Sequence, residues 1–272
     1  MRLDLHVHTV ASDGTWTPEE VVEGAVSGRL DAISVTDHDT TASVESAREA
    51  AQGRNLLVIP GVELSSTWEG REIHILGYFI DPASPAIIEH QARATSLRNA
   101  RMEGMVGRLR AQGIDVTMGA VRAVAGGDDA ILARPHLARV LVSAGHVATL
   151  AEAFDRFIGD RHPAFLPTAL QDPVEAVDVV RAAGGVAVWA HPLADAIPEL
   201  LPILVRGGLR GIEVYRPTSS AGHVERLLSV ALSQGLVASG GSDWHDPERN
   251  GPLGAFFVTS DDVGGLLDEG EI

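Results

Sequence analysis

Two histidines near the start of the sequence have the spacing of metal ligands. Residues 3–8 alternate apolar and polar side chains, which is the period of a β-strand. The alternation places His6 and His8 on one strand face, and Asp13 follows in a short turn. Two imidazoles and a carboxylate can bind a divalent metal such as zinc, manganese or iron. The same pair could instead lie on an exposed edge strand, so this stretch alone leaves both interpretations open.

Further side chains of this kind recur where later strands are expected to end. Apolar strands are expected over residues 31–36, 56–59, 73–78, 185–190, 211–215, 237–240 and 256–258. In parallel α/β barrels, the carboxyl ends of the strands are where sites form. The candidate ligands at or near these ends are His6, His8, Asp13, His38, Glu63, His74, His191, Asp243 and His245. One catalytic zinc takes about three protein ligands, so this set predicts two or three metals, with Glu63 as a bridging carboxylate.

Composition limits the partners of the chain. Its 272 residues, 45% of them hydrophobic, suffice for a single α/β barrel with an insertion. A net charge of −16 opposes binding to duplex DNA or an anionic membrane, but permits a small phosphorylated substrate held by metals and arginines. The absence of cysteine excludes a thiolate nucleophile or ligand. Without a leader or a membrane-spanning apolar run, a cytoplasmic location is expected.

The alternation of strands and helices is interrupted in the middle of the chain. Helices are expected there over residues 86–112, 118–125, 135–144 and 150–158. A flexible break is expected at residues 126–129. We therefore predict a barrel built from residues 1–82 and 166–272, and a helical insertion, or cap, over residues 83–165.

As a set, the motifs resemble those of the PHP (polymerase and histidinol phosphatase) metallophosphoesterases. The resembling stretches are His6-Val7-His8, Asp13, Thr36-Asp37-His38-Asp39, Gly61-Val62-Glu63, His74, His191-Pro192 and Gly241-Ser242-Asp243-Trp244-His245. The resemblance implies a distorted (β/α)7, TIM-like barrel that hydrolyses phosphoesters. It also implies two or three divalent metal ions, manganese before zinc or iron.

The resemblance further implies how the ligands are shared. One metal would be bound by His6, His8, Glu63 and Asp243, a second by Glu63, His74 and His191, and a third by Asp13, His38 and His245. Many relatives have histidine where this chain has Asp13, which would weaken the third site or favour manganese over zinc.

Within the family, the helical insertion and the stretch 133–136 resemble a narrower group. This group comprises nucleoside 3′,5′-bisphosphate phosphatases and 5′-3′ oligoribonucleotide exonucleases. The resemblance implies that Arg134 binds a substrate phosphate and that His136 assists. The residues agree, because Arg134 lies at an expected helix start, where the helix N-terminus also attracts anions.

Three further residues are candidate substrate contacts. Relatives often have lysine where this chain has His162, and the neighbouring Arg161 could replace it. Arg216 lies just past an expected strand and could bind an anion.

The expected function is therefore release of phosphate from nucleoside 3′,5′-bisphosphates, with 5′-3′ trimming of short oligoribonucleotides as an extension. Divalent metals would activate water for attack on phosphorus, while Arg134 orients a neighbouring phosphate. His191 or His245 could protonate the leaving oxygen, or serve only as a ligand.

Other functions remain open. Histidinol-phosphate phosphatase is the first alternative, although a cap with Arg134 suits a second phosphate better than an imidazole. A metal-dependent amidohydrolase usually needs a carboxylated lysine, and this chain contains no lysine. A non-catalytic, metal-stabilised module would require degraded ligands, and none is evident.

Overall fold

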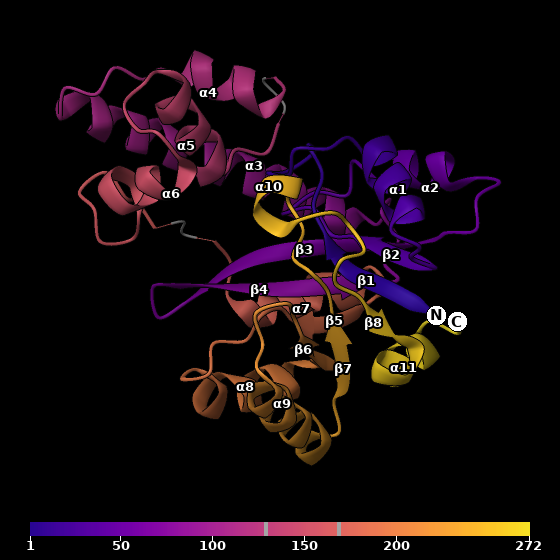
Figure 1. The fold of residues 1–272 in the computed structure, drawn as a ribbon. Helices are drawn as coiled ribbons and strands as arrows, with labels where there is room; N and C mark the ends of the chain where they lie inside the picture. The colour runs from indigo at the N-terminus through magenta and orange to yellow at the C-terminus, as the bar shows by residue number, and fades with distance from the viewer. Residues whose placement is uncertain (128–129, 168–169) are drawn as a thin grey trace.

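One curved sheet forms the centre of the molecule. The computed structural model describes residues 1–127, 130–167 and 170–272 (Figure 1). Within them the strands follow the order β7-β6-β5-β4-β3-β2-β1-β8. Their bounds are β1 Arg2–Val7, β2 Ala32–Val35, β3 Leu57–Trp68, β4 Arg71–Tyr78, β5 Val186–Trp189, β6 Gly211–Tyr215, β7 Val237–Gly240 and β8 Val258–Thr259.

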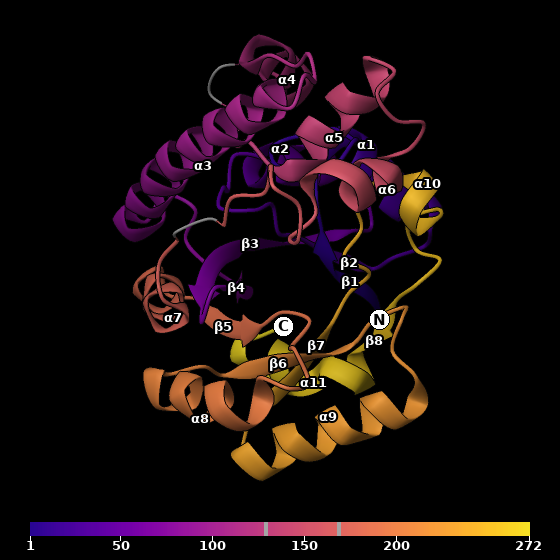
Figure 2. The same cartoon turned by 90° about the vertical axis from the view of Figure 1, so that its left-hand side faces the viewer.

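The sheet closes nearly completely into a barrel, seen end-on in Figure 2. Closure comes from the segment after β7, because Trp244 pairs with Val7 at the end of β1. The amide of His8 donates to the carbonyl of Trp244 at 2.8 Å, and the amide of Trp244 donates to the carbonyl of His6 at 3.1 Å. His6 and His8 are thus fully buried on an internal strand. The predicted TIM-like barrel is confirmed, and the edge-strand interpretation is wrong.

Two strands run against the expected direction. β4 is antiparallel to both β3 and β5, and β8 is antiparallel to β1, whereas the expected barrel was parallel throughout. For β4 the reason is a tight turn after β3, where Glu69 (φ 50°) and Gly70 (φ 76°) both have the positive φ of a hairpin turn. His74 therefore comes from the middle of an antiparallel strand rather than from a parallel strand's carboxyl end.

Helices cover the outside of the barrel (Figure 2). Thr17 caps the first of them: its hydroxyl accepts from the amide of Glu20, and its own amide donates to the Glu20 carboxylate, which together form a capping box. The helices are α1 Pro18–Ser27, α2 Val44–Ala51, α7 Pro173–Ala182, α8 Ile197–Gly207, α9 Ala221–Gln234, α10 Pro247–Asn250 and α11 Ser260–Glu269.

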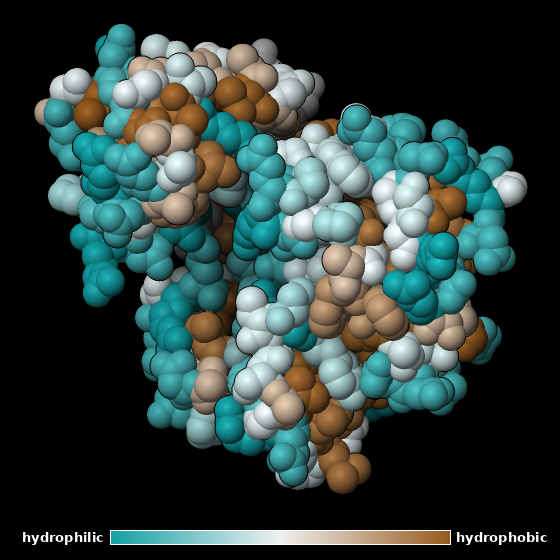
Figure 3. All heavy atoms as spheres, in the orientation of Figure 1, coloured by the Kyte–Doolittle hydropathy of each residue, from teal (hydrophilic) through white to brown (hydrophobic). Residues whose placement is uncertain are grey.

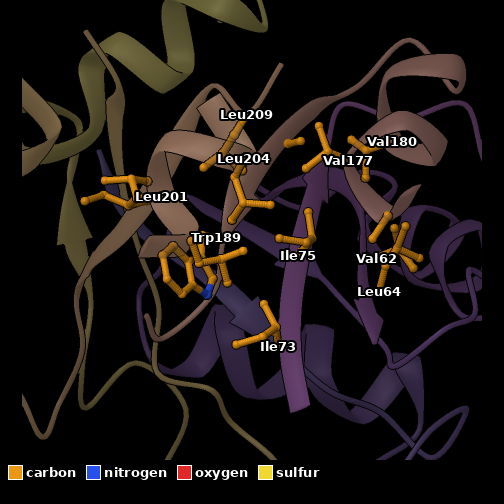
Figure 4. Close-up of a cluster of buried hydrophobic side chains, with 14 of the residues drawn as sticks. Val62, Leu64, Ile73, Ile75, Val177, Val180, Trp189, Leu201, Leu204 and Leu209 are labelled. Atoms are coloured by element: carbon orange, nitrogen blue, oxygen red, sulfur yellow. The ribbon is translucent and has the colours of Figure 1, made fainter. Parts of the chain in front are cut away.

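Successive side chains of a strand point to opposite faces of the sheet, which places core residues on one face and candidate ligands on the other. In β4, Ile73 and Ile75 face the covering helices, where they join a buried cluster with Leu204 of α8 and Val180 of α7 (Figure 4). Each fully buried side chain of this size contributes about 1.5–3 kcal/mol through the hydrophobic effect. His74, between the two isoleucines, must then point to the barrel interior. The apolar residues of β4 thus fix the direction of a candidate ligand.

The segment between β4 and α7 has a hydrophobic core of its own. Its buried apolar side chains all lie between Met102 and Ala164. The outline of the molecule is indented between this segment and the barrel (Figure 3). Its elements are α3 Pro85–Ala111, α4 Met118–Ala125, α5 Arg134–Ser143, α6 Leu150–Ala153 and the π-helix η1 Phe154–Ile158. We call this segment the cap. The limits at residues 83 and 165 stay a prediction, and residues 128–129 of the expected break lie outside the described residues.

Among the described helices, none combines the length and apolar character that crossing a membrane requires.

Gly241 is expected to tolerate no side chain. A Cβ added there would lie 2.4 Å from the Cβ of His6 and 2.5 Å from its backbone nitrogen. Gly241→Ala should therefore lower the free energy of unfolding in urea by about 1–3 kcal/mol. Gly107→Ala in helix α3, where nothing lies within 4 Å, is the control and should be neutral or stabilising. Equal stability of both variants would contradict the prediction.

Candidate metal centre

A single buried carboxylate lies at the centre of the site. Glu63 is on β3, has no exposed surface, and is approached by imidazoles from several strand ends. To Oε2 the distances are 3.2 Å from His6 Nε2, 3.2 Å from His8 Nε2 and 3.3 Å from His38 Nδ1. To Oε1 they are 2.9 Å from His74 Nδ1 and 3.0 Å from His191 Nε2. Residues distant in the sequence thus converge on one point.

The donor set fits divalent cations. Four buried atoms of the cluster around Glu63 have no hydrogen-bond partner among the described residues: His6 Nε2, His8 Nε2, His38 Nδ1 and Glu63 Oε2. Burying polar atoms without partners is costly, and lone pairs on neutral imidazoles repel a carboxylate. A metal ion placed among them would satisfy both atom types, since imidazole and carboxylate are its common ligands.

Three groups of side chains have ligand atoms within 4.8 Å of one another. They are His6, His8, Glu63 and Asp243; then His8, Asp13, His38 and His245; and His38, Glu63 and His74. The first is the set expected for the first metal. The second contains the set expected for the third metal, with His8 added. The third shares Glu63 and His74 with the set expected for the second metal, but has His38 in place of His191, which lies 3.0 Å from Glu63 Oε1. The nine predicted residues thus lie together, while their assignment to individual metals stays a proposal.

Protonation differs across the cluster. Burial raises the pKa of Glu63, but the neighbouring imidazoles outweigh it and hold the pKa well below its usual value. Burial lowers the pKa of His38 to about 3, so Glu63 is ionised and His38 is neutral at physiological pH. Burial lowers the pKa of His8, but the carboxylates of Asp243 and Glu63 outweigh it and raise that pKa to about 10, so a metal binding there would replace a proton.

His245 is held in one tautomer. Its Nδ1 lies 2.8 Å from the carbonyl oxygen of Asp243, so Nδ1 carries the proton and donates it. The free Nε2 faces Asp13 Oδ1 at 3.3 Å. This geometry favours a ligand over a proton donor at His245.

Glu213 holds two of the candidate ligands, His6 and His191, in position. Sequence reasoning missed this residue. Its carboxylate accepts from His6 Nδ1 at 2.8 Å and from the amide of His191 at 2.7 Å. The first bond leaves His6 Nε2 to face Glu63, as a metal ligand requires. The second holds His191 in a positive-φ conformation (φ 30°) that non-glycine residues rarely adopt. The one sequence signal for it was an acidic residue at the centre of an expected apolar strand, Gly-Ile-Glu-Val-Tyr.

Two more buried carboxylates hold the loops that carry ligands. Asp37 accepts from the amide and hydroxyl of Thr9 at 2.7 and 2.8 Å and from the Ser12 hydroxyl at 2.7 Å. Asp4 accepts from the amide and hydroxyl of Ser242 at 2.8 and 2.6 Å. Each bond ties the turn before or after a candidate ligand to a strand, so the ligand positions are fixed by the fold.

A third buried carboxylate joins the barrel to the cap. Asp39 follows His38 and accepts from His90 Nε2 and Arg98 Nε, both of helix α3, at 2.8 Å each. The amide of Ser65 also donates to Asp39, at 2.8 Å. Burial raises the pKa of Asp39, but Arg98 and His90 outweigh it and lower the pKa strongly. Helix α3 is thereby anchored beside the candidate metal centre.

A pocket of about 390 Å³ opens above the cluster, with arginines on two sides. Arg98, Arg101 and Arg134 line it from the cap, and Arg216 and Arg249 line it from the barrel. Sequence reasoning picked Arg134 and Arg216 but missed the other three. An acidic chain thus gathers guanidinium groups where its candidate metals would lie.

Of the substrate contacts predicted in the cap, the structure places some at the pocket and others away from it. Arg134 lines the pocket, where its Nη2 lies 3.2 Å from Glu72 Oε2. His136 is buried instead and accepts from the amide of Ala133 at 3.1 Å, so it caps helix α5. Arg161 and His162 are not among the residues that line the pocket. The structure therefore favours Arg134 and not these three residues as a contact.

Comparison with known proteins agrees with the geometry. The PHP domain matches residues 4–157 of the chain. This chain belongs to the PHP family. The 5′-3′ exoribonuclease Rnm of Salmonella typhimurium is 38% identical over 252 residues, covering 90% of the PHP chain and 85% of its own length. The 3′,5′-nucleoside bisphosphate phosphatase of Chromobacterium violaceum is 32% identical over 260 residues, covering 92% and 89%.

A solved structure shows the same fold. The chain from Bifidobacterium adolescentis, to which a metal-dependent phosphoesterase activity is assigned, superposes with a TM-score of 0.88 and 34% identity. The match covers 98% of this PHP chain and 96% of the other. The protein is thus a metal-dependent phosphoester hydrolase, as the motifs predicted.

Removing the partner of Asp39 should be costly. Arg98→Met leaves a buried carboxylate without its cation, and we expect the free energy of unfolding to fall by about 3–5 kcal/mol. The control is Arg93→Met on the same helix, whose exposed ion pair with Glu175 should contribute less than about 1 kcal/mol. Urea denaturation of both variants checks this. Equal losses would show that Asp39 does not depend on Arg98.

Glu213 should control metal affinity without touching the metal. Glu213→Gln keeps the shape but removes the charge that orients His6, and should weaken manganese binding by about 10–100-fold. Calorimetric titration with manganese measures this directly, with Glu225→Gln on exposed helix α9 as the control. Unchanged affinity in Glu213→Gln would exclude the positioning role.

Proposed function

We propose that this PHP phosphoesterase releases phosphate from nucleoside 3′,5′-bisphosphates. The observation that carries the proposal is one pocket that joins a histidine-rich cluster to the cap arginines. One phosphate would occupy the cluster and the other would contact Arg134. The name of the Chromobacterium violaceum relative, a 3′,5′-nucleoside bisphosphate phosphatase, supports this substrate class.

The cap side is suited to a second phosphate. Arg134 is held by acids that a phosphate could displace, namely Glu72 at 3.2 Å and the exposed Asp160. Burial raises the pKa of Glu72, but Arg134 and Arg101 outweigh it and lower the pKa to about 2. A guanidinium already organised by carboxylates can bind a phosphate in the same planar, bidentate way.

The rings next to Arg134 suit a nucleoside. The guanidinium carbon of Arg134 lies 5.7 Å from the ring centre of Phe154 and 5.3 Å from that of Phe165. Phe154 also lines the pocket above the cluster. Aromatic rings of this kind can stack on a base, which a substrate lacking a nucleobase would not use.

We propose three sets of metal ligands. They are His6, His8, Glu63 and Asp243; Glu63, His74 and His191; and Asp13, His38 and His245. We favour two or three manganese ions over zinc or iron, because Asp13 contributes a hard oxygen ligand. When bound, such ions lower the pKa of water and stabilise negative charge on phosphoryl oxygens.

The proton for the leaving oxygen has one better candidate. His191 is one quarter exposed (25%) and faces the pocket, whereas the Nδ1 proton of His245 is already donated to a backbone carbonyl. His191 Nε2 faces Glu63 Oε1 as a ligand atom would, so we propose that His191 donates through its other ring nitrogen, Nδ1, and that His245 is only a ligand. Exclusion of duplex DNA, argued from the net charge of −16, belongs to the same proposal. A cytoplasmic location stays a proposal as well.

The function can be tested with adenosine 3′,5′-bisphosphate and manganese. We expect phosphate release by the wild type, and a fall in kcat/KM of about 10–100-fold in Arg134→Ala, because a charge-assisted phosphate contact is lost. Arg110→Ala, an exposed arginine of helix α3, is the matched control.

The alternative function gives the opposite pattern. Rapid release of phosphate from histidinol phosphate, with none from the bisphosphate, would identify a histidinol-phosphate phosphatase. Equal effects of Arg134→Ala and Arg110→Ala would remove Arg134 from the substrate site.

A further inference from the structure

A second pocket adjoins the candidate metal centre on the side away from the cap. It has a volume of about 320 Å³ and shares His191 and Arg216 with the pocket above the cluster. Its other lining residues include Ser219, His223 and Arg226, from the loop after β6 and from helix α9. The two pockets thus meet at the residues that flank the cluster.

The basic side chains of this second pocket are available to bind a ligand. Across residues 1–127, 130–167 and 170–272, Arg226 forms no hydrogen bond or ion pair, and neither does the imidazole of His223. The one buried acid of the pocket, Glu213, is already engaged by His6 and His191. In a chain of net charge −16, an arginine without an acidic partner beside the site favours an anionic ligand.

A nucleoside bisphosphate leaves this pocket without a role. Its two phosphates are accounted for by the cluster and by Arg134. In an oligoribonucleotide, by contrast, the phosphorus at the cluster also carries the next nucleoside through O5′. The strand beyond that phosphorus needs space on the side away from Arg134. The second pocket is the space that adjoins the cluster there.

The reaction is the same for both substrates. The oxygen of water bonds to phosphorus, the bond from phosphorus to ribose O3′ breaks, and O3′ takes a proton. A bisphosphate yields a 5′-mononucleotide and inorganic phosphate. An oligoribonucleotide yields a 5′-mononucleotide and a shortened strand with a new 5′-phosphate.

We propose that the second pocket binds the nucleotide on the 3′ side of the scissile phosphate, with Arg226 and His223 contacting the next phosphodiester. This rests on the function proposed above and extends it to short single-stranded RNA. Arg216 lies where the two pockets meet, because it lines both of them. Its Nη2 is 3.2 Å from Oδ2 of the candidate ligand Asp243.

Three substrates of increasing length separate the contacts. They are adenosine 3′,5′-bisphosphate, the 5′-phosphorylated diadenylate, and the 5′-phosphorylated triadenylate, the only one of the three with a phosphodiester beyond the scissile one. Arg226→Ala should raise KM for the triadenylate about threefold to fivefold, as expected for an exposed charge contact, and leave KM for the bisphosphate unchanged. Arg206→Ala, an exposed arginine of helix α8, is the matched control.

Salt dependence gives a second readout that a merely structural role would not move. Each phosphate contact to a single strand contributes a slope of about 0.7 to the dependence of log affinity on log salt. Arg226→Ala should reduce that slope for the triadenylate and not for the bisphosphate.

The outcomes distinguish the two proposals. Wild-type hydrolysis of the bisphosphate but not of the triadenylate would overturn the second pocket and keep the proposed function. So would equal effects of Arg226→Ala and Arg206→Ala on the triadenylate, or equal effects of Arg226→Ala on both substrates. Hydrolysis of neither substrate would overturn the proposed function, and the second pocket with it.

Discussion

The structure depends on one buried negative charge. Taking the carboxylate of Glu63 out of water costs several kcal/mol, so a fold that buries it fully must supply compensation. Imidazoles from five positions along the chain surround it, and several of their nitrogens have no hydrogen-bond partner in the described part of the molecule. The charge of Glu63 is compensated either by protons on these imidazoles, whose pKa it raises at His6 and His8, or by metal cations shared among all of the groups. The barrel is therefore best understood as a frame for metal ions.

Further buried carboxylates hold the loops that carry the candidate ligands. Asp37, Asp39 and Glu213 each bind the backbone or side chain next to a candidate ligand, so each loop has its own buried anchor. Positive φ at Asp39, His191 and Asp243 shows where these anchors are needed, since non-glycine residues adopt that conformation at a cost. The loops are thus held rigid where a metal site needs its ligands at fixed distances.

Sequence reasoning found the candidate ligands because most of them follow a local rule. Histidines and acids at or near the ends of apolar strands could be recognised from alternation alone, and the structure brings them close to one another. Strand direction followed no such rule, since apolar periodicity is the same in parallel and antiparallel strands, and β4 was assigned wrongly. Glu213 and Arg98 were missed because their partners lie 207 and 59 residues away along the chain. His136 lies in a stretch that resembles a family motif, but in the structure its side chain caps its own helix, α5.

The arrangement of charge also bears on substrate choice. A protein of net charge −16 repels polyanions at long range, so any phosphate must be captured by local groups. All of the fixed positive side chains are arginine, and those at the site come from the cap on one side and from the barrel on the other. Long-range repulsion would select against long nucleic acids, while local arginines would retain short ones. A small acidic barrel with arginines at its site is therefore suited to short phosphorylated ligands rather than to long polyanions.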